Sequence, residues 1–371
     1  MILVITIIFY IIAVLAVLVS MALFWGVVFR AESSPDEIHF VITRDGWRIA
    51  LHRYLPMGDE RWREPVFLCH GLGANRFDLD LDARFSLARC LRSSGFDCWV
   101  IELRGAGMSA KPRLFDHRYR FDWTFEEYYR KDIPAAIQHI RQVTGADAVH
   151  WVGHSMGGML LYAFLEREEA RWIRSGVTIA SPVDFDDMII GIKGLVRLRK
   201  VLKWFPFVPL GIWVKLLSPL PGLFAPLLKF GFNPRNVDSD VARRVCANMM
   251  EPLVCRELLL QFGDWLDNGR WRSLDRSFDF TEHLGDITTP ILVLAGSGDL
   301  QAPQSTVRGA FERIASEDKL YIEFGRTLGQ PVDYGHGDLV FGREAPRVVF
   351  PHICDWIRRH SAPANASQKK N

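Results

Sequence analysis

One ten-residue stretch, Val149–Gly158, constrains the fold of this chain more than any other part of its sequence. It reads Val-His-Trp-Val-Gly-His-Ser-Met-Gly-Gly, so that Ser155 separates an apolar, strand-like run from an apolar, helix-like run. Gly153 and Gly157 flank the serine two positions away on either side, where small residues allow a strand and a helix to pass close to each other. The pattern predicts a sharp strand-to-helix turn that presents a serine hydroxyl at the edge of a sheet.

The rest of the chain repeats this alternation of strands and helices. We expect a hairpin from 38–42 and 47–54, further strands at 66–69, 98–101, 149–152, 176–180, 291–295 and 320–323, and helices at 85–91, 125–143, 156–165, 307–314 and 348–360. Pro134 is expected to kink the second of these helices. Because most of the strands are continuous apolar runs, the pattern predicts an α/β fold with a mostly parallel sheet covered by helices on both faces.

A serine hydroxyl is a poor nucleophile unless a base takes its proton and an acid orients that base. Beyond a turn of this kind, the acid and then the histidine should follow the serine along the chain. His336 meets that order, because it follows the run at 320–323 and precedes the last helix. The other ten histidines lie before the turn, in the insertion or in the last helix, and His154 is too close to Ser155 to turn back onto it. We therefore predict Ser155 as the nucleophile and His336 as its base, with His154 packed inside the turn.

Two aspartates compete for the role of the orienting acid. Asp299 follows the strand at 291–295 in the glycine-rich turn Gly-Ser-Gly-Asp, at the carboxyl end where catalytic loops gather. Asp184 follows the preceding strand, where it also marks the entry to a long insertion. The glycine-rich turn favours Asp299.

A negatively charged tetrahedral intermediate needs two preorganised backbone donors. The first is expected to be the amide of Met156, directly after the nucleophile. The second is expected in the loop after the strand at 66–69, where Gly71 and Gly73 flank Leu72 and allow its amide to face the pocket.

Several other kinds of chemistry are excluded by the sequence. The spacing of Gly71 and Gly73 resembles the start of a dinucleotide loop, but Arg76 stands where that loop needs its third glycine. No zinc-protease, phosphate-loop or calcium-loop pattern is present, so we predict no cofactor and no metal. The net charge of +2 argues against a nucleic-acid partner, and six widely spaced cysteines argue against a disulfide scaffold or a zinc site. No protein partner is predicted.

Residues 2–29 carry no charged side chain. At about 1.5 Å per residue, this segment is long enough to cross a hydrocarbon core of ~30 Å. A cleavable signal peptide would need a basic start and a shorter core of roughly 7–15 residues, and both are missing. The segment therefore predicts an uncleaved single-pass anchor. Arg30, Arg44 and Arg48 follow it, and this charge bias favours a cytoplasmic catalytic domain.

The long insertion between the strands at 176–180 and 291–295 differs in composition from the rest. Between Met188 and Val237 there is no acidic residue but eight basic ones, namely Lys193, Arg197, Arg199, Lys200, Lys203, Lys215, Lys229 and Arg235. Aromatic residues such as Trp204, Phe205 and Phe207 lie among them, a composition typical of an interfacial surface. We interpret the insertion as a helical cap and predict that it docks on the bilayer beside the anchor.

The predicted organisation has five parts. They are an anchor at 1–30, the first part of the sheet domain at 36–182, the cap at 183–283, the second part of the sheet domain at 284–360 and a disordered tail at 361–371.

As a whole the chain resembles the α/β-hydrolase superfamily, and within it the acid-lipase type of the gastric and lysosomal lipases. The resemblance covers roughly 36–360 without most of the cap. It is carried by His70-Gly71-Leu72, by 95–100 with Arg104-Gly105, by 121–127 and 132–137, by the turn at Ser155, by Gly298-Asp299 and by 335–342. It implies a serine carboxylester hydrolase acting on lipid-like esters. An acyltransferase or thioesterase with the same three residues is the alternative, and a non-catalytic, membrane-tethered binding module is a third hypothesis.

Overall fold

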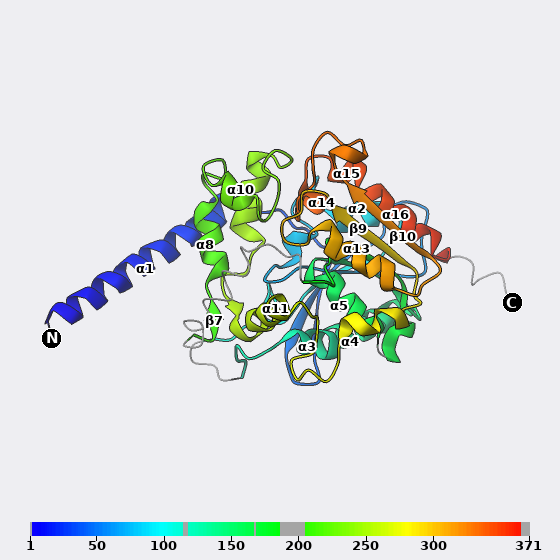
Figure 1. Ribbon diagram of the computed structural model, residues 1–371, viewed down its shortest axis with the longest axis horizontal. Helices are drawn as coiled ribbons and strands as arrows, with labels where there is room; N and C mark the ends of the chain where they lie inside the picture. Colours follow the sequence, from blue (N-terminus) through cyan, green and yellow to red (C-terminus); the bar gives the residue numbers. More distant parts are fainter. Residues whose placement is uncertain (1, 114–117, 167, 186–204, 365–371) are drawn as a thin grey trace.

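The computed structural model describes residues 2–113, 118–166, 168–185 and 205–364. Its centre is an eight-stranded sheet (Figure 1). The strands are β1 (Glu37–Ile42), β2 (Arg48–Tyr54), β3 (Val66–Cys69), β4 (Cys98–Glu102), β5 (Val149–His154), β6 (Ile173–Ile179), β9 (Ile291–Gly296) and β10 (Lys319–Phe324). They lie in the order β1-β2-β4-β3-β5-β6-β9-β10, antiparallel between β1, β2 and β4 and parallel elsewhere.

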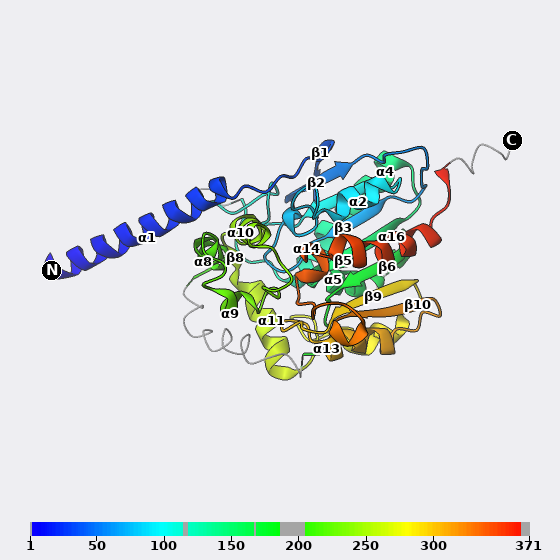
Figure 2. The ribbon, with the colours of Figure 1, turned by 90° about the horizontal axis from the view of Figure 1, so that it is seen from above.

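Helices cover the two faces of the sheet and build the cap (Figures 1 and 2). In the sheet domain they are α2 (Leu87–Ser93), α3 (Phe125–Glu127), α4 (Ile133–Thr144), α5 (Met156–Leu165), α13 (Gln304–Arg313), α14 (Asp338–Phe341), α15 (Ala345–Val348) and α16 (Phe350–Arg359). Between β6 and β9 lie α8 (Leu210–Leu217), α9 (Ala225–Leu228), α10 (Ser239–Asn248), α11 (Arg256–Asn268), α12 (Phe280–His283) and a small sheet of β7 (Phe207–Val208) with β8 (Val254–Cys255).

The inner strands β3, β4, β5 and β9 are buried on both faces, whereas the edge strands β1 and β10 are partly exposed. Neighbouring residues along a strand point to opposite sides of the sheet. In β3, Phe67 and Cys69 belong to the core under α4 and α5. Val66 and Leu68 belong to the core under α2 and α16. The predicted α/β fold, with a mostly parallel sheet between two helical layers, is confirmed.

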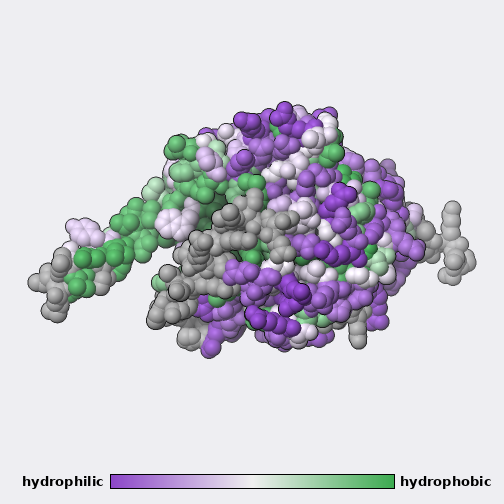
Figure 3. Space-filling view, viewed as in Figure 1, coloured by the Kyte–Doolittle hydropathy of each residue, from purple (hydrophilic) through white to green (hydrophobic). Residues whose placement is uncertain are grey.

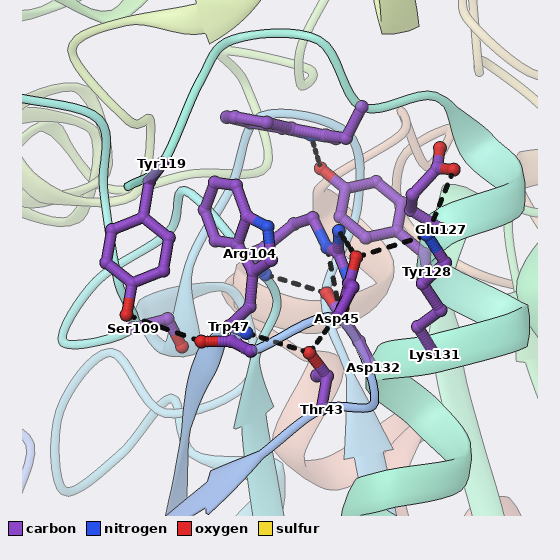
Figure 4. Close-up of polar contacts among 12 residues, drawn as sticks. Thr43, Asp45, Trp47, Arg104, Ser109, Tyr119, Glu127, Tyr128, Lys131 and Asp132 are labelled. Carbon is purple, nitrogen blue, oxygen red and sulfur yellow. Dashed lines mark hydrogen bonds and ion pairs between the residues drawn. The ribbon is translucent and has the colours of Figure 1, made fainter. Parts of the chain in front are cut away.

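Arg104 follows β4, is buried, and lies beside the turn between β1 and β2 (Figure 4). Its guanidinium donates to Asp132 Oδ1, at 2.6 Å from Nη2 and 2.9 Å from Nε, and to Asp45 Oδ2 at 2.9 Å. Lys131 Nζ reaches the same Asp45 oxygen at 3.1 Å. Because a buried charge without its partner is strongly unfavourable, these contacts set the position of the hairpin relative to the helix that carries Asp132.

The helix predicted at 125–143 is interrupted by a π-helical turn at Tyr128–Asp132, between α3 and α4. Pro134 explains the difference, because in a regular α-helix its ring would collide with the carbonyl of Arg130. The wider turn relieves that clash. It also places Asp132 against Arg104. The kink expected at Pro134 stays a prediction.

The first helix, α1 (Ile2–Val28), projects from the body and packs against α8 and α10 near its end (Figures 1 and 2). Ala22 is 3% exposed there, and a Cβ atom at Gly26 would lie 3.7 Å from Ala247 O of α10. Its segment Val4–Val28 is long and apolar enough to cross a membrane. The end of α1 is thus packed against the cap.

Glu166, after α5, generates a prediction about stability. Among the described residues its two carboxylate oxygens are buried without a hydrogen-bond partner, and burial together with Asp286 and Asp279 raises the pKa of Glu166 to about 9. The native state therefore keeps a proton that the unfolded chain releases above its ordinary pKa of 4.5, so the stability from this group declines as pH rises through that window. We expect the Tm of wild type to fall relative to that of Glu166→Gln between pH 5 and pH 9. Parallel Tm curves in differential scanning calorimetry would contradict this.

Candidate active site

The turn between β5 and α5 has the tight geometry that its sequence predicts. Ser155 takes a left-handed backbone conformation with φ 53° and ψ −120°, which is strained for a residue other than glycine. A Cβ atom on Gly153 would lie 2.3 Å from the carbonyl carbon of Gly157, and one on Gly157 would lie 2.2 Å from Cys69 O. Only glycine fits at these two positions, so β5, α5 and the end of β3 meet at the serine.

His336 lies in the loop between β10 and α14, and Asp299 lies in the loop after β9. Nδ1 of His336 is 2.8 Å from Asp299 Oδ2, and both side chains are buried. The other oxygen of Asp299 accepts hydrogen bonds from the amides of Gln301 and Ala302, each at 2.8 Å. These two amides fix the carboxylate in the direction of the imidazole.

Asp184, the other candidate acid, lies elsewhere. Its Oδ2 is 2.7 Å from Nη1 of Arg313 in a partly exposed ion pair on the side of α13. The structure therefore brings Asp299 to His336, while Asp184 has a separate partner.

The loop after β3 lies against the serine. An added Cβ atom at Gly71 would be 3.1 Å from Ser155 Cβ, and Gly73 has a positive φ of 64°. Leu72 lies between them and lines the same cavity as Ser155. Met156 is the first residue of α5, so its amide has no carbonyl of the preceding turn to bind. Both amides that were predicted to bind an oxyanion thus come from segments that adjoin the serine.

His154 makes polar contacts that the sequence interpretation missed. Its Nδ1 is 2.9 Å from Asp78 Oδ2, and its Nε2 is 3.3 Å from the carbonyl of His336. Burial alone would lower the pKa of His154, but the Asp78 carboxylate, together with the His336 carbonyl and Asp299, outweighs burial and raises it. The same Asp78 oxygen accepts from the amide of Gly71 at 2.9 Å. His154 is therefore more than packing: with Asp78 it links the turn, the loop after β3 and the loop of His336.

Asp338 holds the loop of His336 against the cap. Its Oδ1 accepts from the amide of Asn233 at 2.8 Å and its Oδ2 from Nδ2 of Asn236 at 3.0 Å. Burial raises the pKa of Asp338 to about 6, although these donors favour the ionised form. The histidine loop and the 233–236 segment consequently share one buried carboxylate.

A cavity of about 940 Å³ extends from Ser155 and His336 into the cap. Ser155, His336 and Leu72 line it on the sheet domain, and Trp213, Phe224, Val245 and Leu259 are among the residues that line it in the cap. Among the described residues, no lining residue between 210 and 266 is charged, and no group of three or more His, Cys, Asp or Glu side chains is placed to hold a metal ion. The cavity offers a hydroxyl and an imidazole at one end of an apolar volume.

Comparison with known proteins places this architecture among hydrolases. A family model described as alpha/beta hydrolase fold matches residues 64–342. Triacylglycerol lipase 2 of Arabidopsis thaliana is 29% identical over 374 residues, covering 88% of this chain and 85% of that protein. The lysosomal acid lipase/cholesteryl ester hydrolase of Homo sapiens is 26% identical over 367 residues, covering 88% of each. A solved structure of a thermophilic esterase from Thermogutta terrifontis has a TM-score of 0.58 at 18% identity, covering 88% of this chain and all of that one. The resemblance to the acid-lipase type is confirmed.

The separation of the two aspartates yields a test of their roles. We expect Asp299→Asn to lower kcat for a nitrophenyl ester by roughly 10³–10⁴-fold, because an amide favours the wrong imidazole tautomer and does not stabilise the imidazolium. Asp184→Asn is the matched control and should stay within about twofold of wild type, since exposed ion pairs contribute little. The reverse ranking of the two variants in steady-state kinetics would assign the acid to Asp184.

Proposed function

Because the chain belongs to the α/β-hydrolase fold family and is a carboxylester hydrolase of the lipase and esterase type, we propose that it hydrolyses lipid esters by a serine mechanism while anchored in a membrane. The observation that carries the proposal is the apolar cavity that Ser155 and His336 share. The names of two relatives, a triacylglycerol lipase and a cholesteryl ester hydrolase, support lipid esters as the substrate class.

In the proposed reaction, Ser155 Oγ attacks the ester carbonyl while His336 accepts its proton. Asp299 keeps the imidazole in the tautomer that accepts a proton at Nε2 and stabilises the imidazolium that forms. The amides of Leu72 and Met156 bind the negative charge on the former carbonyl oxygen. His336 then protonates the departing alcohol, and a water molecule cleaves the acyl-enzyme by the same steps in reverse.

The cavity supports a long acyl chain as the group transferred to the serine. Its volume of about 940 Å³ is near the upper end of the usual 300–1,000 Å³ for ligand pockets, and its cap side is apolar. A chain buried there would gain roughly 0.8 kcal/mol for each CH₂ group removed from water. We therefore expect long-chain esters to be preferred over short ones.

The serine mechanism predicts the outcome of two single substitutions. Ser155→Ala and His336→Ala should each lower kcat for nitrophenyl esters by roughly 10⁴–10⁶-fold, leaving only the contributions of binding and the oxyanion donors. Ser155→Ala should also lose labelling by a fluorophosphonate probe. Circular dichroism serves as the control for folding, and near-normal turnover by folded Ser155→Ala would reject the mechanism.

Membrane anchoring is proposed from α1 and the cap surface beside it. Leu15 and Leu23 are among the many exposed apolar side chains of α1. The cap adds the exposed apolar residues Leu220 and Leu223, at 57% and 71% exposure. Trp213 and Leu227 are also exposed, and they line the cavity as well. Figure 3 shows hydrophobic residues covering α1 and continuing onto the adjoining cap. The packing of the end of α1 against α10 supports an anchor that stays attached, because cleavage would expose the cap surface that it covers.

The predicted basic docking surface falls mostly on residues that the structure does not describe. Lys193, Arg197, Arg199, Lys200 and Lys203 lie outside the described residues, as does Trp204. Phe205 is described and is 55% exposed. Within the described cap, Lys229 and Arg235 are exposed and Lys215 is half-buried, so the proposal of bilayer contact there depends on these three basic residues together with the apolar side chains.

An uncleaved anchor predicts that the chain purified from membranes retains residues 2–29 and resists alkaline extraction. The double variant Leu15→Arg with Leu18→Arg is the matched control and should be released, because each arginine at the bilayer centre costs about 2.5–3.5 kcal/mol. Intact-protein mass spectrometry and carbonate extraction measure both effects. A mature chain that lacks residues 2–29 would identify a signal peptide instead.

Protease protection in sealed vesicles tests the predicted cytoplasmic orientation of the catalytic domain.

A further inference from the structure

The junction between α1 and the cap contains a hydrogen bond to the main chain of the anchor. Asn248, the last residue of α10, donates from Nδ2 to the carbonyl of Phe29 at 2.6 Å and to the carbonyl of Arg244 at 2.9 Å. The guanidinium of Arg243 lies over the Phe29 ring at 6.0 Å. The chain leaving the membrane helix is thus bonded to the C-terminal end of α10.

The same asparagine contacts the loop that adjoins Ser155. Nδ2 of Asn75 donates to the carbonyl of Asn248 at 2.9 Å and to Glu251 Oε1 at 3.0 Å. Oδ1 of Asn75 accepts from the amide of Phe77 at 3.1 Å. Asn75 is 6% exposed, so these contacts replace solvent for its whole amide group.

Two further contacts attach this loop to the cap. The amide of Glu251 donates to the carbonyl of Gly73 at 2.7 Å, and Ala74 pairs with Met250 in an antiparallel bridge. The Glu251 carboxylate is 5% exposed and also accepts from Lys111 Nζ at 2.6 Å. The loop is therefore attached to residues 248–251 through three consecutive residues, Gly73, Ala74 and Asn75.

The segment after α1 also forms hydrogen bonds to the sheet domain, at residues that directly follow the same loop. Nε of Arg76 donates to Ser33 Oγ at 3.2 Å, and Arg76 directly follows Asn75 in the chain. The amide of Glu32 donates to the carbonyl of Leu81 at 3.0 Å. Residues 29–33 consequently lie between α10 and the segment that continues the loop.

We propose that Asn75 and Asn248 are positioning residues that hold the loop at 70–75 in its reactive geometry against the end of α1. Through this relay, the path from Phe29 through Asn248 and Asn75 to the loop, the membrane helix supports the reaction in addition to tethering the enzyme. The inference rests on the proposed function, because it takes the Leu72 amide in that loop as an oxyanion donor. A donor displaced by about 1 Å lowers a rate by up to ~10²-fold, so small movements of this loop matter.

The test uses the full-length chain in detergent micelles and a water-soluble substrate, nitrophenyl butyrate, for which tethering gives no advantage. Asn248→Ala removes the bond to Phe29. Asn75→Ser keeps a hydroxyl that can accept from Phe77 but loses the two donations to the cap. Asn268→Ala is the matched control, because Asn268 is exposed at the end of α11 and, among the described residues, donates within its own helix to Asp264.

We expect each of the two variants to lower kcat about 10- to 100-fold with KM unchanged within about twofold, since the loop acts on the transition state. The kcat of the double variant should be no lower than that of the slower single variant, because Asn75→Ser and Asn248→Ala disrupt the same set of contacts. Asn248→Gln keeps an amide donor and should recover most of the kcat lost in Asn248→Ala. Asn268→Ala should match wild type.

The relay is rejected if folded Asn248→Ala and Asn75→Ser keep kcat within twofold of wild type, or if the effects multiply in the double variant. It is also rejected if KM alone changes or if Asn248→Gln is as slow as Asn248→Ala. Ser155→Ala on the same substrate distinguishes a failure of the serine mechanism from a failure of the relay. An active Ser155→Ala would overturn the proposed function, whereas an inactive Ser155→Ala beside fully active asparagine variants would overturn only the relay.

Discussion

The contact between the helix after the serine and the end of β3 is the constraint on which the active site depends. Gly157 comes so close to Cys69 O that no side chain fits there, and this approach forces the turn at Ser155 into its strained backbone. Because the loop at 70–75 starts directly after Cys69, the same contact sets the distance between the nucleophile and the expected oxyanion donors. One steric requirement thus positions two parts of the site.

The other parts of the site are held by buried polar pairs rather than by close packing. Asp299 orients His336, Asp338 attaches the histidine loop to the cap, and Asp78 joins His154 to Gly71. Each pair is buried, so its geometry is strict: a lost partner would leave an unpaired charge or dipole away from water. The cap and the sheet domain therefore share the site through fixed bonds as well as through the walls of the cavity.

The parts of the fold that could be predicted from the sequence are those encoded locally. The strands and the turn at Ser155 follow from runs of apolar residues and from glycine spacing, and they recur in the structure with shifts of a few residues at their ends. The bond between Asp78 and His154 joins positions 76 residues apart, and the bond between Asn75 and Asn248 joins positions 173 apart. A single sequence gives no local signal for such pairs. The roles of Ser155, His336, Asp299, Leu72 and Met156 stay predictions, and so do the limits of the five domains.

The π-helical turn at Tyr128–Asp132 makes this part of the chain sensitive to length rather than to composition. An α-helix rotates by about 100° per residue, so deleting one residue before Asp132 would turn its carboxylate away from Arg104 by roughly that angle. Inserting one residue would turn the carboxylate in the opposite direction and would also separate it from Arg104. In the evolution of this chain, residues 125–131 should therefore accept substitutions of similar shape far more readily than insertions or deletions, whereas Asp132 is fixed by its ion pair with Arg104.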